Sequence, residues 1–478
     1  MAIPFHDRYL ALVSEIERHY GVTRWKQHDV NIWPLARMAL YLDMYWTYAG
    51  GQPTEPRRWL PLRIMARATR PLCNIWHSRG DLAHIHLWPK RCHAIFLGDG
   101  VCLDHVCGAW RDRFAEPLIG ALEQRGLQSF LMQGGGFSRL PYLRQTFPAN
   151  IAQSWGALAA SFIPRNAQLP DHDVVLRFLS ENGVSAPSLS RVALEESAAQ
   201  VAGAATIFTW ILSVVRPEIA FVTRYFAGLG PAFVLACRRR GIFCVDLQCA
   251  PLQGAPMAYA LTNKPPPDFL PDKFWLWTQA DVANVANWAN GRAFHGGYIP
   301  QTNAPPESVA DKGYDKEILI ALQPVAGCRD TWEALADAVE ASPASWRWWI
   351  RRHPASTPGQ DAEFGRLLKL RGPAIMLAEA SAPLPQLLPR MHAVVSLGSG
   401  TAVEAAMFGV PSLFLSPSAE MAFGDLITGG TAQVVDVRMI SDAIGGLGPK
   451  IVLAPKAPDM DEALTHVQSL ARAHRVTT

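Results

Sequence analysis

A turn rich in serine and glycine near residue 400 carries the side chains best suited to ligand chemistry. Residues 393–416 have the sequence AVVSLGSGTAVEAAMFGVPSLFLS, which predicts a buried strand, a turn, a helix and a second buried strand. The N–H groups at a helix start bind phosphate or carboxylate, and glycine lets a ligand approach the backbone closely. The candidate binding residues of this turn are Ser396, Ser399, Gly400, Thr401 and Glu404. An ordinary hydroxyl-capped strand–turn–helix has the same pattern, so this segment alone leaves both interpretations open.

A strand with a basic end lies upstream of this turn. Residues 346–354 have the sequence WRWWIRRHP, and the candidate phosphate-binding residues are Arg351, Arg352, His353 and Pro354. Open α/β sheets bind ligands beyond the carboxyl ends of their strands, so two such strand ends predict a nucleotide-phosphate site. A merely exposed or helix-capping histidine is the alternative for His353. The ordered pair of segments is more specific than either segment alone.

Together these two segments resemble the C-terminal domain of bacterial cell-surface polysaccharide glycosyltransferases of the two-domain GT-B type. The resemblance is clearest over residues 217–435, and the capsule and lipopolysaccharide members carry a His-Pro motif and a downstream serine turn. It implies that His353, Ser399, Gly400 and Thr401 bind a nucleotide-sugar donor, with a CMP-activated acidic sugar favoured over a UDP- or GDP-sugar. The implied acceptor is an oligosaccharide, polysaccharide or lipid-linked saccharide. The implied transferase uses no metal and no further cofactor.

Acidic and basic side chains follow a strand predicted at residues 93–98. The resemblance places acceptor-binding and catalytic groups of GT-B enzymes in this loop. The candidates for the base that deprotonates an acceptor hydroxyl are Asp99, Asp104, His105 and Asp112. A solvated polar loop is the alternative interpretation.

A third segment departs from the pattern of the same transferases. In that family the strand predicted here at residues 241–247 is followed by Gln-His-Gly, with a further His before a Tyr. This chain has Cys249 at the first His position and Met257 near the second. The remaining candidate acceptor or cleft residues are Gln248, Cys249, Gln253 and Tyr259. The missing histidines leave open a degenerate GT-B protein that acts as a binding or assembly subunit, and a UDP-GlcNAc 2-epimerase-like enzyme is the other alternative.

Alternating strand and helix patterns position these residues. They predict an α/β fold of the GT-B type, with two Rossmann-like domains facing a cleft and an N-terminal helical extension. The expected segments are an extension over 1–90, an acceptor domain over 91–305, a donor domain over 306–455 and a helix over 456–478 that packs back on the acceptor domain. A helix is also expected over 363–370, and a loop over 99–114.

The composition limits the class of protein. Of the 478 residues 49% are hydrophobic and 18% charged, which provides for a large core and argues against disorder. The net charge of +3 is too small to indicate nucleic-acid binding. Eight cysteines without a CxxC pair indicate reduced thiols, and no apolar run reaches membrane-spanning length, so we expect a cytoplasmic protein. Residues 1–60 carry Trp and Arg side chains that would allow peripheral association with the inner membrane or with an assembly complex.

Overall fold

The computed structural model describes most of the chain, and the chain forms two compact units. The described residues are 5–48, 87–134, 140–250, 252, 256–261, 270–289, 291–299, 313–323, 328–353, 364–380, 383–417, 419–448 and 460–477. The first unit comprises Met1–Cys102, Ala109–Ile299 and Pro458–Thr478, and the second comprises Leu103–Gly108 and Pro300–Ala457. The chain therefore leaves the first unit, builds the second and returns.

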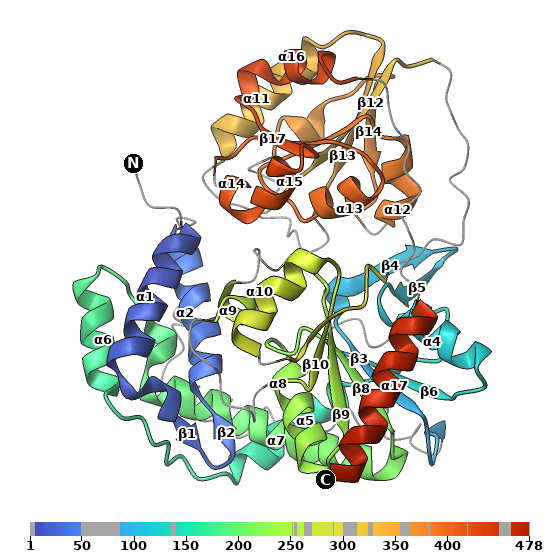
Figure 1. Ribbon diagram of the computed structural model, residues 1–478. Helices are drawn as coiled ribbons and strands as arrows, with labels where there is room; N and C mark the ends of the chain where they lie inside the picture. Colours follow the sequence, from blue (N-terminus) through green and yellow to red (C-terminus); the bar gives the residue numbers. More distant parts are fainter. Residues whose placement is uncertain are drawn as a thin grey trace. The chain divides into compact units, whose positions relative to one another are not determined.

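The first unit is built on a parallel sheet (Figure 1). In spatial order its strands are β11 (Ala293–His295), β10 (Lys273–Leu276), β9 (Phe243–Leu247), β8 (Ile219–Thr223), β3 (Ala94–Gly98), β6 (Ser129–Gln133) and β7 (Phe147–Pro148). All residues of β3, β8 and β9 are buried, as expected for parallel strands covered by helices on both faces. The helices joining the strands include α4 (Ala115–Gln124), α8 (Gly230–Arg239) and α10 (Gln279–Ala289).

The N-terminal helices share the core of this sheet. They are α1 (Phe5–His19) and α2 (Trp33–Tyr48), joined by a short helical turn and the small hairpin β1 (Lys26–Gln27) and β2 (Val30–Asn31). One continuous cluster of buried side chains runs from Tyr9 and Leu40 to Phe274. The described part of the predicted extension over 1–90 therefore packs within the first unit.

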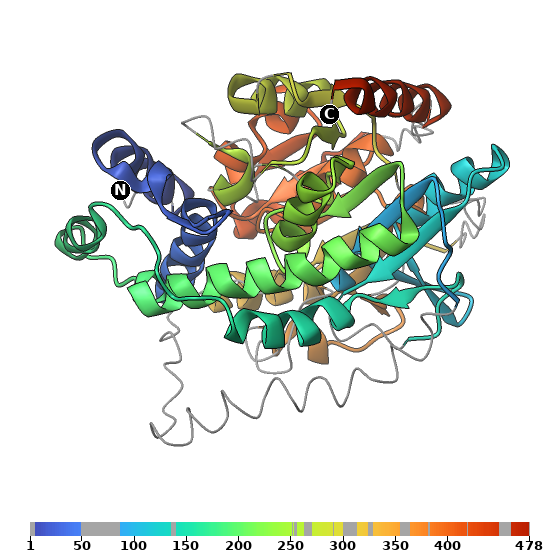
Figure 2. The same ribbon diagram turned by 90° about the horizontal axis from the view of Figure 1, so that it is seen from below.

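A long apolar helix lies in the same core. Among the described residues α7 (Arg191–Val215) is the one helix long and apolar enough to cross a membrane, and 56% of its apolar window is buried inside the protein. It packs against α5 (Asn150–Ser161) and α8 (Figure 2). Its buried side chains include Leu194, Phe208 and Ile211. The apolar side chains of α7 therefore pack in the core against two other helices.

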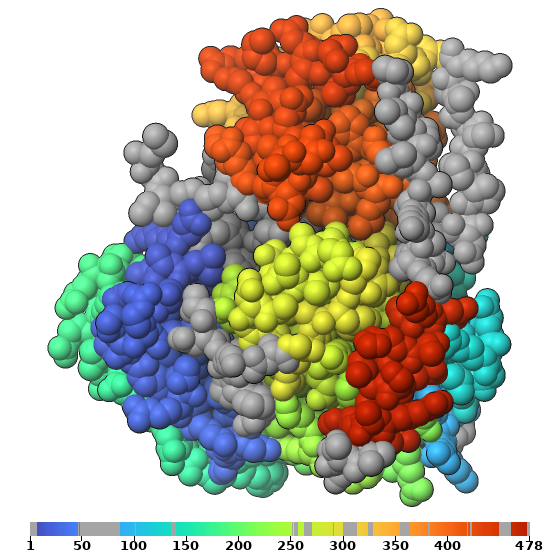
Figure 3. Space-filling model, in the orientation of Figure 1, coloured from blue at the N-terminus to red at the C-terminus, as the bar shows by residue number. Residues whose placement is uncertain are grey.

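The C-terminal helix α17 (Met460–Thr477) packs on the first unit. Arg125, which follows α4, pairs with Asp461 at 2.7 Å. The rings of His466 and Phe294 lie 5.6 Å apart, centroid to centroid. Figure 3 shows α17 in red along the surface of this unit, beside residues of α10 and β11 in yellow.

The second unit is a smaller parallel sheet with helices on both faces. In spatial order its strands are β14 (Ile375–Ala378), β13 (Trp346–Arg351), β12 (Lys316–Ala321), β15 (Ala393–Ser396), β16 (Ser412–Phe414) and β17 (Ala432–Val434). Its described helices include α11 (Arg329–Glu340), α12 (Leu384–Leu387), α13 (Thr401–Met407), α15 (Gly424–Thr428) and α16 (Ile440–Gly445). Alternate strand residues face two cores, with Ile318 and Ile320 in one and Leu319 in the other.

Two local predictions differ from the structure. The expected loop over 99–114 contains the hairpin β4 (Leu103–Val106) and β5 (Ala109–Asp112), whose turn residues Cys107 and Gly108 have φ of 51° and 79°. Two-residue hairpin turns of this kind prefer Asn-Gly or Asp-Gly, because both central residues have positive φ. Here only the second of the two, Gly108, is a preferred residue, since cysteine is unusual at positive φ. The helix expected over 363–370 is reduced, in its described part, to a turn and the short 3-10 helix Leu367–Lys369. The seven described cysteines form no disulfide.

Candidate functional site

In the second unit the sheet changes winding direction between β12 and β15. The chain runs from β12 to β13 and β14 on one side, then crosses to β15, β16 and β17 on the other. Ligands of open α/β sheets bind beyond the carboxyl ends of the strands at such a point. Gln323 follows β12 there, and its Nε2 donates to the Gly398 carbonyl oxygen at 2.9 Å. Its Oε1 is buried without a partner among the described residues, so the amide offers an acceptor at this point.

The serine–glycine turn after β15 is held by its own hydroxyls. The Ser399 N–H donates to Ser396 Oγ at 3.1 Å, and the Thr401 N–H donates to Ser399 Oγ at 3.3 Å. The Ser399 hydroxyl also donates to Thr401 Oγ1 at 3.1 Å. These bonds lie within the turn, and α13 behind them has only seven residues, with Gly400 as its N-cap. The anion-binding helix start expected from the sequence is therefore partly occupied by the protein itself.

The backbone of this turn requires glycine at one position. Gly398 has a φ of 152°, a conformation that residues with a side chain rarely adopt. Gly400 lies two residues later, half-exposed, directly before α13. Glu404 lies one turn into α13 and is 6% exposed, so its carboxylate is inside the unit rather than on the surface.

The basic residues after β13 divide into a buried and an exposed group. Arg351 is 5% exposed, and its Nη2 donates to the Ala380 carbonyl oxygen at 2.7 Å, so it ties β13 to the segment after β14. Arg352 and His353 are exposed directly beyond the strand. Pro354 lies outside the described residues. Of the predicted phosphate-binding group, Arg352 and His353 are thus the exposed members among the described residues.

The first unit has its own switch point, between β3 and β8. From β3 the chain proceeds to β6 and β7 on one side, and from β8 to β9, β10 and β11 on the other. Asp99 follows β3 and Arg224 follows β8, and Asp99 Oδ2 lies 3.0 Å from Arg224 Nη1. Both side chains are partly exposed, at 25% and 30%. The sequence predicts Asp99 as a site residue, and the structure adds Arg224 as its partner.

Arg224 has a strained backbone. Its φ is 60°, in the left-handed region, where a residue with a Cβ costs about 1–2 kcal/mol. Such strain is common at functional positions, because surrounding contacts hold the side chain in one direction. Here the next residue is anchored, since the Tyr225 N–H donates to Asp246 Oδ1 at 3.1 Å and the Tyr225 hydroxyl donates to the Ala258 carbonyl oxygen at 2.6 Å. The fold therefore fixes Arg224 against Asp99.

Asp112 lies in a fully buried polar cluster. Its Oδ1 accepts from the N–H groups of Phe114 at 3.0 Å and Ala115 at 2.9 Å, at the start of α4. Its Oδ2 and the Gln133 amide have no hydrogen-bond partner among the described residues, and both side chains are 0% exposed. Burial raises the pKa of Asp112 to about 7. The predicted base Asp112 is therefore sealed from solvent.

The other two predicted bases lie on the β4–β5 hairpin. Asp104 is 2% exposed and His105 is half-buried, both on β4. The segment Leu103–Gly108 that carries them groups with the second unit. Asp99 and His105 are thus the candidate bases that solvent reaches.

The predicted acceptor residues after β9 mainly serve the fold. The Gln248 amide accepts from the Trp277 N–H at 2.8 Å and donates to the Ala250 carbonyl oxygen at 3.1 Å, and Gln248 is 1% exposed. The Tyr259 hydroxyl donates to Asp246 Oδ2 at 2.6 Å within the core. Burial raises the pKa of Asp246 to about 7. Neither predicted residue faces solvent.

Cys249 lies beside a second thiol. It is half-buried, and its hydrogen bond to Cys102, together with burial, raises the pKa of the Cys102 thiol well above its usual value. Gln253 lies outside the described residues. Among the described residues no group of three or more His, Cys, Asp or Glu side chains could hold a metal ion.

Comparison with known proteins bears on the fold. No protein-family model matches the sequence, and no curated protein sequence matches it either. The structure of MnaA from S. aureus with UDP is similar, with a TM-score of 0.50, 12% identity and coverage of 80% of this chain and 97% of that one. UDP-GlcNAc 2-epimerase of Methanocaldococcus jannaschii, with UDP-GlcNAc and UDP, has a TM-score of 0.48, 14% identity and coverage of 80% and 99%. The calicheamicin glycosyltransferase CalG4 has a TM-score of 0.41, 14% identity and coverage of 80% and 95%.

These likenesses, at such low identity, concern the fold. Two parallel-sheet α/β units and the similarity to MnaA along four-fifths of the chain give it the two-domain Rossmann-like GT-B fold. This confirms the fold class expected from the sequence. Sequence reasoning missed Arg224, Gln323 and Gln133, although each stands at the end of a buried strand or within two residues after it, and that position was the available signal.

Proposed function

We propose that this protein is a glycosyltransferase that takes a sugar from a nucleotide-activated donor. The observation that carries the proposal is the pair of switch points, each with polar groups beyond its strand ends in a GT-B fold. Support for a nucleotide ligand comes from MnaA, whose similar structure contains UDP. The reaction type rests on the residues at the two switch points.

The donor nucleotide is assigned to the second unit. Arg352 and His353 are exposed beyond β13 and would pair with phosphate oxygens. Gln323 Oε1, buried at the switch point, would accept a hydrogen bond from a donor N–H or O–H group. Gly400 would let the ligand approach the backbone at the turn. In the reaction the bond between the anomeric carbon and the phosphate oxygen breaks, and the nucleotide leaves with the electron pair. Cations near that oxygen would stabilise its developing charge.

The acceptor is assigned to the first unit. Its hydroxyl oxygen attacks the anomeric carbon and its proton passes to a base. Of the predicted bases we favour Asp99, because it lies at the switch point and is partly exposed, whereas Asp112 and Asp104 are buried. Arg224 would then be a positioning residue that fixes the Asp99 carboxylate.

The donor class remains the proposal drawn from the motifs. The His-Pro sequence and the serine turn favour a CMP-activated acidic sugar, with a growing bacterial surface polysaccharide as acceptor. The second candidate is a UDP-GlcNAc 2-epimerase-like enzyme, because that class shares the two-Rossmann architecture and a Ser/Gly turn followed by Glu before a GVP-like strand, as at Glu404 and residues 409–411 here. The two candidates differ in the nucleotide bound and in the need for an acceptor.

The test is binding followed by turnover. Thermal unfolding is measured with CMP, CDP, UDP, GDP and ADP, since a ligand at about 100-fold its Kd stabilises the folded state by about 2.7 kcal/mol. We expect CMP to raise the melting temperature, and His353→Ala to remove most of that rise. The matched control is His19→Ala, an exposed histidine of α1 in the other unit, which should leave the rise unchanged.

Turnover separates the candidates. Nucleotide release that requires an added saccharide acceptor supports the transferase. Conversion of a UDP-sugar without acceptor supports the epimerase. Binding of none of the five nucleotides contradicts both enzymes and favours the non-catalytic binding subunit that the replacement at Cys249 leaves open.

A further inference from the structure

A pocket lies in the second unit, at the edge of its sheet opposite to the proposed donor residues. It has a volume of about 540 Å³, within the range of small-molecule sites. Trp346 begins β13 and Ile375 begins β14, so the pocket lies at the amino ends of these strands. A strand of six residues is about 20 Å long, which separates this pocket from the carboxyl ends where Arg352 and His353 lie.

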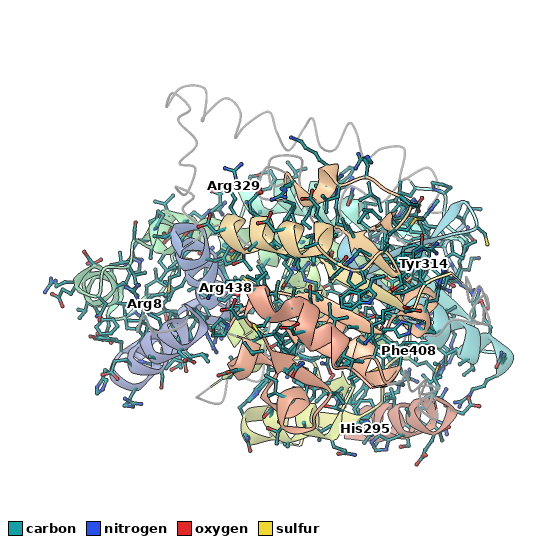
Figure 4. All side chains as sticks on the ribbon, turned by 90° about the horizontal axis from the view of Figure 1, so that it is seen from above. Arg8, His295, Tyr314, Arg329, Phe408 and Arg438 are labelled. Atoms are coloured by element: carbon teal, nitrogen blue, oxygen red, sulfur yellow. The ribbon has the colours of Figure 1, made fainter. Side chains whose placement is uncertain are left out.

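Two segments wall the pocket. One wall is the last turn of α11 and the residues after it, including Glu340 and Ser342, and the other contains Arg366, Lys369 and Arg371. Its remaining lining includes the rings of Trp346, Trp348 and Tyr314. In Figure 4 the labelled Tyr314 lies toward the end of α11 opposite to Arg329, the first residue of that helix.

Hydrogen bonds hold both walls in place. The Trp348 indole N–H donates to Ser342 Oγ at 2.9 Å, and the Tyr314 hydroxyl donates to the Pro373 carbonyl oxygen at 3.0 Å. The Arg366 guanidinium pairs with Asp337 and Glu340 of α11, which joins the two walls directly. The pocket is therefore formed before a ligand arrives, which lowers the entropic cost of binding.

The charges of the lining are mostly positive. The charge of Arg366 is balanced by Asp337 and Glu340, which leaves Lys369 and Arg371 as the lining cations without an ion pair to any described residue. Lys369 is exposed and makes no ion pair with any described residue. Arg371 Nη1 donates to the Leu368 carbonyl oxygen at 2.8 Å, and this bond leaves its charge intact. The rim thus attracts an anion, while the Glu340 carboxylate can still accept from a hydroxyl group.

We propose that this pocket binds an acidic saccharide. Three features of the lining match three features of such a ligand. The cations of Lys369 and Arg371 suit a sugar carboxylate, Glu340 suits sugar hydroxyl donors, and the apolar part of the lining, which includes Leu370 and Ile375, suits the C–H surface of the ring. A phosphate group lacks both the apolar surface and the hydroxyl donors, so the lining fits it less well. This site does not rest on the proposed function, because the donor residues lie at the other edge of the sheet.

The test is calorimetric titration of the full chain with tetragalacturonic acid, and with maltotetraose as the neutral probe of the same length. We expect tetragalacturonic acid to bind at least about tenfold more tightly, with an affinity that falls as salt is raised. Lys369→Glu should weaken that binding by about tenfold or more, and Lys369→Gln by less. Lys26→Glu, which makes the same charge change on β1 of the first unit, should leave binding unchanged.

Three results would overturn the proposal. They are equal affinity for the two saccharides, unchanged binding by Lys369→Glu, and competition by inorganic phosphate at concentrations similar to the saccharide. The second result would place the bound saccharide elsewhere, such as the acceptor region of the first unit. Because Lys369 is exposed and unpaired among the described residues, its variants should keep the parent melting temperature, which separates a lost site from a lost fold. Nucleotide binding in the same variants reports independently on the proposed function.

Discussion

Replacing Gly98 by alanine should disturb the buried polar cluster at the end of β3. A Cβ at this position would lie 2.0 Å from Gln133 Oε1 and 2.2 Å from Asp112 Oδ2. Both side chains are 0% exposed, so neither can swing into solvent. Each oxygen would have to retreat by about 1 Å or more to reach ordinary van der Waals contact.

The loss of unfolding free energy follows from the packing and the hydrogen bonds that this displacement disturbs. Overpacking a close-packed interior costs about 1–3 kcal/mol. Moving Asp112 also weakens its hydrogen bonds to the N–H groups of Phe114 and Ala115, each worth about 1 kcal/mol. The gain from replacing a strand glycine by alanine is about 0.5–1 kcal/mol and only partly offsets these terms. We expect Gly98→Ala to lower the free energy of unfolding by about 3 kcal/mol.

Urea unfolding followed by far-ultraviolet circular dichroism measures this change. Gly120→Ala is the matched control, because Gly120 lies inside α4 and a Cβ there would meet no atom within 4 Å. That control should stabilise the protein by about 0.5–1 kcal/mol through its higher helix propensity. If Gly98→Ala lies within about 1 kcal/mol of the parent, the claim that Asp112 and Gln133 close on Gly98 is wrong.

Three further changes test the buried and strained groups. Burial raises the pKa of Asp112 to about 7, so its stabilising contribution is complete below about pH 4 and is lost as the pH rises through 7. Asp112→Asn should therefore gain stability over the parent between pH 5 and pH 8, by up to about 4 kcal/mol in urea unfolding, and a pH-independent difference would contradict this. Arg224→Gly should stay within about 1 kcal/mol of the parent, because relief of the left-handed strain offsets the lost pair with Asp99, while acceptor-dependent turnover falls at least about tenfold; unchanged turnover would refute the positioning role. Tyr259→Phe should cost about 1–3 kcal/mol in the same unfolding assay by leaving Asp246 Oδ2 without its donor, and a neutral change would show that this bond contributes little.

The sheets could be predicted from the sequence because their strands are short apolar runs between turn signals. The strand predicted from the start of AVVSLGSG coincides with β15, and the aromatic run WRWWIR coincides with β13. The β4–β5 hairpin could not be predicted in the same way. Its turn places Cys107 at positive φ, and the sequence shows only one of the two residues that such turns prefer.

The sequence predicts which candidate site residues stand at strand ends. It predicts less well which other residues they contact. The local sequence indicates that Asp99 and His353 follow strands, because each stands just after a short apolar run. Whether a polar residue faces solvent or the core depends on residues far away in the sequence. Gln248 bonds to Trp277, and Asp112 closes on Gly98 beside Gln133, so both are buried by contacts that no local pattern contains. Arg224 and Gln323 stand at strand ends without a motif around them, and only the sheet order marks them as switch-point residues.

The return of the chain to the first unit has a consequence for limited proteolysis. Because α17 docks on the first unit through Arg125 and Phe294, the chain crosses between the units after Ile299 and again before Pro458, in addition to its two crossings at the ends of Leu103–Gly108. A single cut between residues 299 and 313 would leave a C-terminal fragment that still carries α17 and stays attached through it. A second cut, between residues 448 and 460, would separate α17 covalently from the second unit. A shortened chain ending at residue 299 would instead expose the apolar surface that α17 covers, and we expect such a fragment to self-associate.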